Sequence, residues 1–158
     1  METRKIFINE PGNYDFKLLL DSINKEEELR IILKANREGV YNLNILSDHL
    51  VEKTFGRVEV RGIAQNGAKV SIIGRVKVEK EAPMTDSFLS MKMLILDGKS
   101  SAIAEPELEI LNNNVKASHS ASVGKIDEEQ LLYLMSRGMD NKSAKNLIVS
   151  GFLEEVIK

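Results

Sequence analysis

The chain has 158 residues, of which 42% are hydrophobic and 29% are charged, a composition typical of a globular protein rather than a disordered one. Its 22 Lys and Arg residues nearly balance its 24 Asp and Glu residues, so the net charge of −2 predicts no nucleic-acid partner, and an aromatic fraction of 5% predicts no base-stacking surface. The absence of cysteine excludes disulfides, thiolate nucleophiles and thiolate metal sites supplied by this chain alone.

The sequence gives no sign of a membrane or of secretion. No apolar run approaches the length of a membrane span. Residues 1–9 have neither the long apolar core nor the small-residue cleavage site of a signal peptide. We therefore predict a cytoplasmic protein without a membrane partner.

Apolar and polar residues alternate along much of the segment 5–123. Residues 57–61 and 75–79 each place two valines on one face and charged side chains on the other. Residues 89–95 repeat Leu, Met, Met and Ile at every second position, a spacing that favours packing in a core over a soft-metal site. A period of two predicts half-buried strands throughout this part of the chain.

The turn at Asn66-Gly67 has two interpretations. It separates the alternating segments 57–63 and 69–78, so it fits a two-residue β-hairpin. It fits a corner of a solenoid equally well, because Asn and Gly adopt positive φ at such corners. Strand-and-turn units recur at roughly 15–25 residues, a spacing compatible with solenoid coils. The local sequence leaves both interpretations open.

The pattern becomes helical at Asp127. Asp127 caps a first helix, Gly138 marks its end, and Asp140 or Asn141 caps a second helix. Apolar residues then recur at a spacing of three or four and predict that the two helices pack together: Leu131, Leu132, Met135, Ala144, Leu147, Ile148, Phe152 and Val156.

These patterns divide the chain into two parts. We predict a β-structure over residues 1–125, in which the first 27 or so residues have no firm assignment, and a helical subdomain over residues 126–158. Gly151 lies inside the second predicted helix, where glycine costs about 1 kcal/mol relative to alanine. We expect it either to admit a close neighbour or to break the helix.

Three groups of residues are candidates for chemistry. His119 lies among small polar residues, where it is either a metal ligand or proton carrier at an interface or a side chain hydrogen-bonded to its neighbours. His49 is expected in a surface loop or turn. Glu105, Glu107 and Glu109 share one face of a strand, a pattern that serves acid–base chemistry but is more typical of a solvated face.

Three motifs in order carry a family resemblance: PELEI at 106–110, SHSASVGKID at 118–127 and YLMSRG at 133–138. Together they resemble the C-terminal region of the SufB/SufD family, the scaffold proteins of SUF iron–sulfur cluster assembly. The resemblance is strong over residues 97–158 and looser over residues 28–99.

The resemblance implies a fold and a role. The fold is a right-handed parallel β-helix followed by a small helical subdomain, which favours a solenoid corner at Asn66-Gly67. Family members pair through their β-helix cores, and their C-terminal helices dock the ABC-type ATPase SufC. Dimerisation of that ATPase is thought to rearrange the scaffold pair so that a cluster is built at the interface.

The resemblance also matches individual residues of this chain to positions that have a role in the family. His119 matches a family histidine proposed to face the assembly site, so we expect it as an interface metal ligand. Ala117 stands where some SufD-type members carry cysteine, Met91 lies near the position of a SufB-type cysteine, and Ser120 replaces a glycine. This chain therefore cannot supply the thiolates of a scaffold, and it is shorter than usual members.

We therefore expect a non-catalytic, SufD-like accessory protein. It binds no cofactor on its own, and an iron–sulfur cluster is expected only at an interface with a cysteine-bearing partner. The expected partners are a SufC-like ATPase and either a SufB-like subunit or a second copy of the chain. The docking residues are expected to be those that helix packing leaves exposed: Tyr133, Arg137 and Met139. Two alternatives are a β-helix carbohydrate-active enzyme and a purely structural partner.

Overall fold

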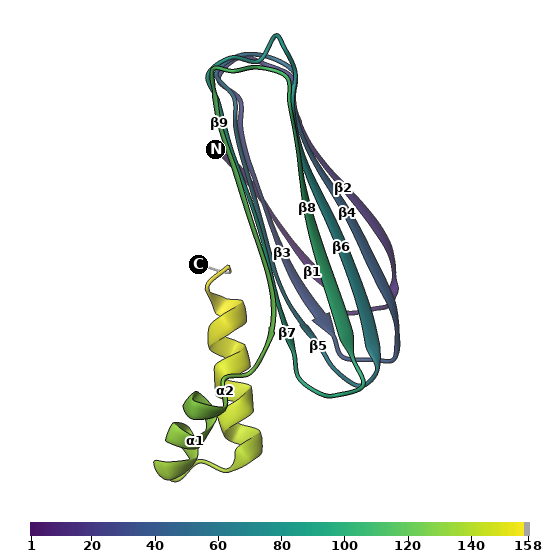
Figure 1. The fold of residues 1–158 in the computed structure, drawn as a ribbon, viewed down its shortest axis with the longest axis vertical. Helices are drawn as coiled ribbons and strands as arrows, with labels where there is room; N and C mark the ends of the chain where they lie inside the picture. Colours follow the sequence, from purple (N-terminus) through teal and green to yellow (C-terminus); the bar gives the residue numbers. More distant parts are fainter. Residues whose placement is uncertain (157–158) are drawn as a thin grey trace.

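The fold is given by a computed structural model, which describes residues 1–156 (Figure 1). Over that range the chain forms nine β-strands followed by two α-helices. The strands are β1 (Glu2–Ile8), β2 (Gly12–Leu20), β3 (Glu26–Ala35), β4 (Gly39–His49), β5 (Phe55–Ala64), β6 (Ala68–Val78), β7 (Thr85–Ile95), β8 (Ser101–Ile110) and β9 (Val115–Lys125). The helices are α1 (Glu128–Ser136) and α2 (Asn141–Glu154). The predicted helical subdomain thus extends by two residues, 157 and 158, outside the described residues.

The strands form two sheets that face each other, an odd sheet in the order β1-β3-β5-β7-β9 and an even sheet in the order β2-β4-β6-β8 (Figure 1). All pairings are parallel. Glu26 pairs with Phe55, 29 residues later, and Lys69 pairs with Ser101, 32 residues later. Each coil therefore runs along one sheet and returns along the other, which confirms the predicted parallel β-helix.

The turn at Asn66-Gly67 joins β5 to β6, which belong to different sheets. It is a corner of the solenoid, so the hairpin interpretation is wrong. Both residues have positive φ, 61° and 83°, as the corner requires. The Asn66 side chain donates to the Asn36 carbonyl of the preceding coil at 2.8 Å, and the Asp97 carboxylate of the next coil accepts from the Asn66 N–H. Stacked corners thus satisfy one another's polar groups.

The space between the sheets is filled by inward-facing side chains that stack in columns from coil to coil. Leu29, Val58 and Leu89 occupy successive positions of one column and are each at most 1% exposed. Met91 and Met93 face the same interior, also at most 1% exposed, as their spacing predicted. Because the register is continuous, a residue's column shows which way its side chain points.

The helical tail is fixed to the solenoid by α2, which lies against the outer face of the odd sheet. Apolar residues of both parts form this contact: Ile32, Ile63, Leu153 and Val156. Arg61 donates to the Phe152 carbonyl at 3.0 Å, and Arg30 donates to the Val156 carbonyl at 3.2 Å. Cations at the C-terminal end of a helix also interact favourably with its dipole. The tail is therefore held by its second helix.

The predicted helix ends are confirmed. Asp127 and Asp140 cap the two helices, each accepting from a backbone N–H in the first turn, and Gly138 ends α1 with a φ of 98°. The expectation for Gly151 is wrong, because α2 continues through it and an added Cβ would meet no atom within 4 Å. Among the described residues, no helix combines the length and hydropathy needed to cross a membrane.

Candidate functional site

One end of the solenoid has no further strand beyond β8 and β9 in the described chain. We call the free edges of these two strands, with their inward-facing side chains, the open end. Val123 continues the column of Met93 but is 40% exposed, against 1% for Met93. Leu108 continues the column of Val76 and is also 40% exposed, against 0% for Val76. The apolar interior of the solenoid therefore reaches solvent at the open end.

His119 lies at the open end, in the middle of β9. It pairs with Leu89, so its imidazole continues an inward column, yet it is exposed. The flanking inward positions carry the small side chains of Ala117 and Ala121. The role of His119 as a metal ligand stays a prediction.

The three glutamates of β8 do not join His119. Glu105, Glu107 and Glu109 point to the outer face of the even sheet and are exposed, which agrees with a solvated strand face. Glu107 forms an ion pair with Arg75 at 2.6 Å. Over residues 1–156, no three His, Asp or Glu side chains converge into a candidate metal site.

The expectation for His49 is wrong, because its side chain is fully buried at the end of β4. Its Nε2 lies 3.2 Å from the Ser47 hydroxyl and 3.1 Å from the Ser87 hydroxyl, and its Nδ1 lies 2.8 Å from the Thr54 hydroxyl. The signal was present in the sequence. Alternation that continues from Ile45 through Ser47 makes His49 an inward residue of the same strand.

Hydroxyl groups contact both ring nitrogens of His49, Thr54 at Nδ1 and the two serines at Nε2. The Thr85 hydroxyl donates to the Ala82 carbonyl at 3.0 Å, and the Thr54 hydroxyl lies 3.2 Å from that of Thr85 and 3.3 Å from the Val51 carbonyl. Because a hydroxyl can donate or accept, these contacts suit a neutral imidazole in either tautomer. Burial lowers the pKa of His49 from 6.5 to about 4, because the interior disfavours the charged form; the Asp48 carboxylate opposes this effect. His49 is therefore a neutral structural residue.

The predicted docking residues lie in α1 and in the turn that follows it. Tyr133 is 58% exposed, Arg137 is exposed, and Met139 is half-buried. The Arg137 guanidinium stacks on the Tyr133 ring, 5.3 Å from its centroid. α1 has no buried residue: Leu131 and Leu134 are half-buried, and the other residues of the helix are exposed. Tyr133 and Arg137 thus form one exposed surface.

Helix packing differs in part from the predicted stripe. Leu147, expected between the helices, is 51% exposed. Leu153, which the stripe omitted, is buried against the solenoid together with Val156. The sequence pattern identified an apolar face of α2 but could not show that this face turns toward the sheet.

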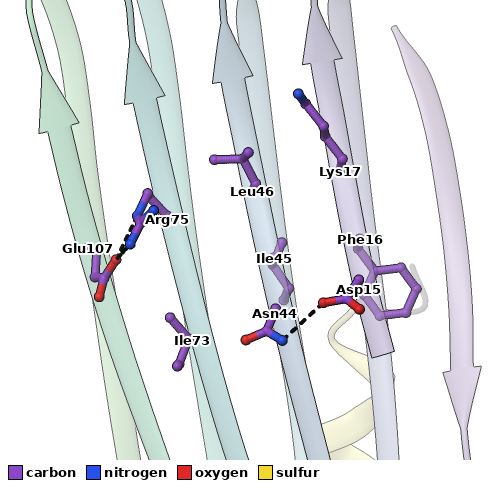
Figure 2. Close-up of a pocket in the computed structure, with 9 residues that line it drawn as sticks. All are labelled: Asp15, Phe16, Lys17, Asn44, Ile45, Leu46, Ile73, Arg75 and Glu107. Atoms are coloured by element: carbon purple, nitrogen blue, oxygen red, sulfur yellow. Dashed lines mark hydrogen bonds and ion pairs between the residues drawn. The ribbon is translucent and has the colours of Figure 1, made fainter. Parts of the chain in front are cut away.

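A groove of about 460 Å³ lies on the outer face of the even sheet (Figure 2). Four of its polar side chains are engaged with one another, since Asn44 donates to Asp15 at 3.0 Å and Arg75 pairs with Glu107. The fifth, Lys17, pairs with Asp48 at 2.9 Å. Its apolar part includes Leu46, and the single aromatic residue among those that line it is Phe16. The groove therefore lacks the stacked aromatics expected of a carbohydrate site.

A family model and the similar proteins of known name point to the same family. Residues 14–152 match the family described as SUF system FeS cluster assembly, SufBD core domain. The chain is 39% identical over 110 residues to the iron–sulfur cluster assembly protein SufB of Bacillus subtilis, covering 70% of this chain and 24% of that protein.

Two staphylococcal relatives align over nearly the whole chain. Identity is 31% over 171 positions to an iron–sulfur cluster assembly SufBD family protein of Staphylococcus epidermidis and 36% over 171 positions to one of Staphylococcus aureus. Each alignment covers 99% of this chain and 37% of the relative. The chain therefore spans well under half the length of these curated relatives.

Proposed function

Because this chain belongs to the SufBD core family of the SUF iron–sulfur cluster assembly system, we propose that it is a non-catalytic, SufD-like accessory protein of that system. The proposal includes a cytoplasmic location, as expected from the sequence. The observation that carries it is the placement of the family histidine, His119, at a solenoid end whose apolar interior is exposed. An exposed apolar surface of this kind is typical of an interaction site.

The absence of cysteine defines the role further. Iron–sulfur clusters are held mainly by thiolates, and this chain has none to contribute. In the proposal, the thiolates come from a SufB-like partner, and His119 faces the cluster from across the interface. The cluster is therefore cargo of the pair and not a resident cofactor of this chain.

The open end is the proposed pairing surface. The free strand edges at this end present unpaired backbone N–H and C=O groups, which can form hydrogen bonds with a strand of another chain. A second copy or a SufB-like subunit that added its own terminal coil would cover Leu108 and Val123. Covering them removes exposed apolar area from water, which favours association.

The helical tail is the proposed docking site for a SufC-like ATPase. Its support is that α1 has no buried residue, whereas α2 is fixed to the odd sheet. Tyr and Arg are the side chains that most often dominate interfaces, and Tyr133 and Arg137 lie together on this helix. Binding at α1 would then act on the solenoid through α2.

The test is binding of the SufC-like ATPase from the same cell to purified variants. Tyr133→Ala and Arg137→Ala should each weaken binding by about 1–2 kcal/mol, roughly five- to thirtyfold in Kd, without a change in melting temperature. Val40→Ala is the matched control, because Val40 is 52% exposed on the even sheet, whereas the tail contacts the odd sheet. Unchanged binding in both tail variants would contradict the docking site.

Measuring the binding of a SufB-like subunit beside that of the ATPase separates the two alternatives. A purely structural partner would bind a SufB-like subunit but show no binding to the ATPase. A carbohydrate-active enzyme would show neither interaction. The groove on the even sheet gives that alternative little support, because Asp15 and Glu107 are already engaged with neighbouring side chains.

A further inference from the structure

The outer face of the even sheet carries a line of aliphatic side chains that crosses all four strands. Leu46 lies two residues before Asp48, the partner of Leu19, and the same shift relates Leu46 to Ile73 and Ile73 to Ile103. Leu19 and Ile103 are 36% and 57% exposed, and Leu46 and Ile73 stand half-buried in the groove of Figure 2. We call these four residues the diagonal stripe.

The diagonal stripe takes no part in the core of the described chain. Within residues 1–156, none of its four members belongs to either cluster of apolar residues, whereas inward residues of the same strands, such as Leu18 and Ile72, are fully buried. Outward positions of a strand with one covered face are ordinarily polar, and parallel sheets are ordinarily covered on both faces. The stripe therefore has the composition of a covered surface but is exposed to solvent.

The two sides of the diagonal stripe differ in charge. On the side toward the ends of the strands, four carboxylates outnumber two cations: Asp48, Glu105, Glu107, Glu109, Arg75 and Lys77. On the side toward the starts of the strands, one carboxylate and one cation lie among amides and a hydroxyl: Asp15, Lys17, Asn13, Asn42, Asn44 and Ser71. The stripe thus has one acidic flank and one neutral flank.

The cations of the acidic flank are already engaged. Arg75 pairs with Glu107 at 2.6 Å, and Lys77 pairs with Glu79 at 2.5 Å. Over residues 1–156, Glu105 has no ion-pair partner, and Glu109 interacts with Lys77 only at longer range. Both glutamates are exposed. The acidic flank therefore keeps two carboxylates available for cations of a partner.

The geometry of the stripe fits a helix and not a strand. The two central strands, β4 and β6, are paired on both sides, so their backbones have no free groups to offer an added strand. Three steps across strands about 4.8 Å apart, each with a shift of two residues along the strand, give a line about 25 Å long. That length corresponds to about 17 residues of α-helix, whose apolar residues at a spacing of three or four form a line on one face.

The odd sheet shows the same arrangement with its helix in place. The apolar residues Ile32 and Ile63 also stand on the outer face of a sheet, and α2, 14 residues long, covers them. The cation beside them, Arg61, donates to the Phe152 carbonyl of that helix at 3.0 Å. An outer-face line of apolar side chains is therefore a surface on which this protein already packs a helix.

The two helices of this chain are poor candidates for the even sheet. α2 is held on the odd sheet, so it would have to leave its own contacts. α1 exposes Leu132 and Tyr133, but its first turn carries Glu128 and Glu129, and its last turn has no basic residue. Beside an acidic flank, such a helix offers no cation. Charge therefore disfavours a second copy of this chain as the occupant.

We propose that the diagonal stripe binds an amphipathic helix of another protein, about 17 residues long, whose Lys or Arg side chains face Glu105 and Glu109. The aliphatic residues of that helix cover Leu46 and Ile73, and its neutral flank faces the amides of β2 and β4. The inference goes beyond the proposed function, because it adds a binding surface on a face of the solenoid that neither the open end nor the tail includes.

A synthetic peptide tests the fit directly. The probe is a fluorescein-labelled helix of about 17 residues with leucine at every third or fourth position, lysine along one flank and glutamine elsewhere. Its partner peptide carries glutamate in place of lysine. Fluorescence anisotropy should show saturable binding of the lysine peptide and at least about tenfold weaker binding of the glutamate peptide. No binding of the lysine peptide, or equal binding of both, overturns the inference.

Variants of the stripe locate the binding. Ile73→Asn should weaken the lysine peptide at least about tenfold, because it removes aliphatic area from the middle of the stripe. Its amide stands in the same row as Asn44 and Asp15, so the sheet has a place for it. Val40→Asn is the matched control, since Val40 is 52% exposed on the same sheet but outside the stripe. Equal losses in both variants overturn the inference.

Leu19→Asn gives a second test at a more exposed position, should Ile73→Asn lower the melting temperature. A folded Leu19→Asn variant that binds the lysine peptide as tightly as the unmodified chain overturns the inference. The acidic flank is tested by the double variant Glu105→Gln, Glu109→Gln. It should weaken the lysine peptide roughly three- to tenfold and reduce the salt dependence of binding. Unchanged affinity and salt dependence overturn the assignment of the basic flank.

The same variant separates this inference from the proposed function. Ile73→Asn should leave binding of the SufC-like ATPase and the oligomeric state of the chain unchanged. A loss of either in that variant assigns the stripe to the ATPase interface or to self-association and overturns the inference. Tail variants that fail to weaken ATPase binding contradict the proposed docking site alone, since binding of the lysine peptide does not involve the tail.

Discussion

The two histidines of this chain occupy equivalent kinds of position in opposite environments. Both lie on strands with their side chains directed toward the interior of the solenoid. His49 is covered by coils on both sides and surrounded by hydroxyl groups, whereas His119 lies at the open end and is exposed. The comparison shows that coverage by neighbouring coils, and not the inward orientation that both side chains share, separates a structural histidine from a candidate functional one.

Replacing each histidine by alanine should give the largest difference in stability between the two positions. His49→Ala removes contacts to three hydroxyl groups and leaves a cavity, so we expect a loss of about 3 kcal/mol or more, roughly 10 °C in melting temperature. His119→Ala should change stability by less than about 0.5 kcal/mol. Thermal unfolding measures both. Equal losses would show that the two environments do not differ as described.

Acid should destabilise the protein through His49. Its folded pKa of about 4 lies below the ordinary value of 6.5, so folding favours the neutral form. The resulting stability is complete above pH 6.5 and is lost as the pH falls toward 4, by about 3 kcal/mol in all. Urea unfolding at several pH values measures this loss. His49→Gln should flatten the profile over this window, and an equally steep profile in that variant would assign the effect to other groups.

Gly56 tests how closely the interior is packed around His49. A Cβ at Gly56 would lie 2.8 Å from His49 Nε2 and 2.8 Å from Ser47 Oγ, so Gly56→Ala should cost about 1–3 kcal/mol. Gly124→Ala is the matched control near the open end, because its Cβ would meet no atom within 4 Å. We expect that control to stay within about 0.5 kcal/mol of the unmodified chain. Comparable losses of stability in both variants would show that the interior around Gly56 is no more closely packed than the surroundings of Gly124.

The smallest expected effect is on cluster binding by the isolated chain, where we expect no change after iron and sulfide are added. Anaerobic reconstitution of the isolated chain should produce no bound cluster, because clusters need about four ligands, mainly thiolates, and His119 supplies one imidazole. The visible absorption spectrum measures this after desalting. A stoichiometric chromophore would show that the open end binds a cluster without a partner. His119→Ala would then identify whether the imidazole takes part.

The helical tail shows how far local sequence signals reach. Asp127, Asp140 and Gly138 identified the helix ends, because capping depends on backbone groups within a few residues. Gly151 and Leu147 were misjudged for the opposite reason. Their surroundings are set by where α2 lies against the odd sheet, which is decided by residues more than 80 positions earlier, such as Arg61 and Ile63.

The sequence by itself determined the strand period, the helix caps, the family motifs and the lack of thiolates, because each depends on neighbouring residues or on composition. Tertiary structure decided the rest. Coil stacking turned Asn66-Gly67 into a corner, buried His49 and left His119 uncovered, although both histidines follow the same alternation. The physical reason is that burial in a parallel solenoid comes from strands about 30 residues away, so no local window of sequence contains it.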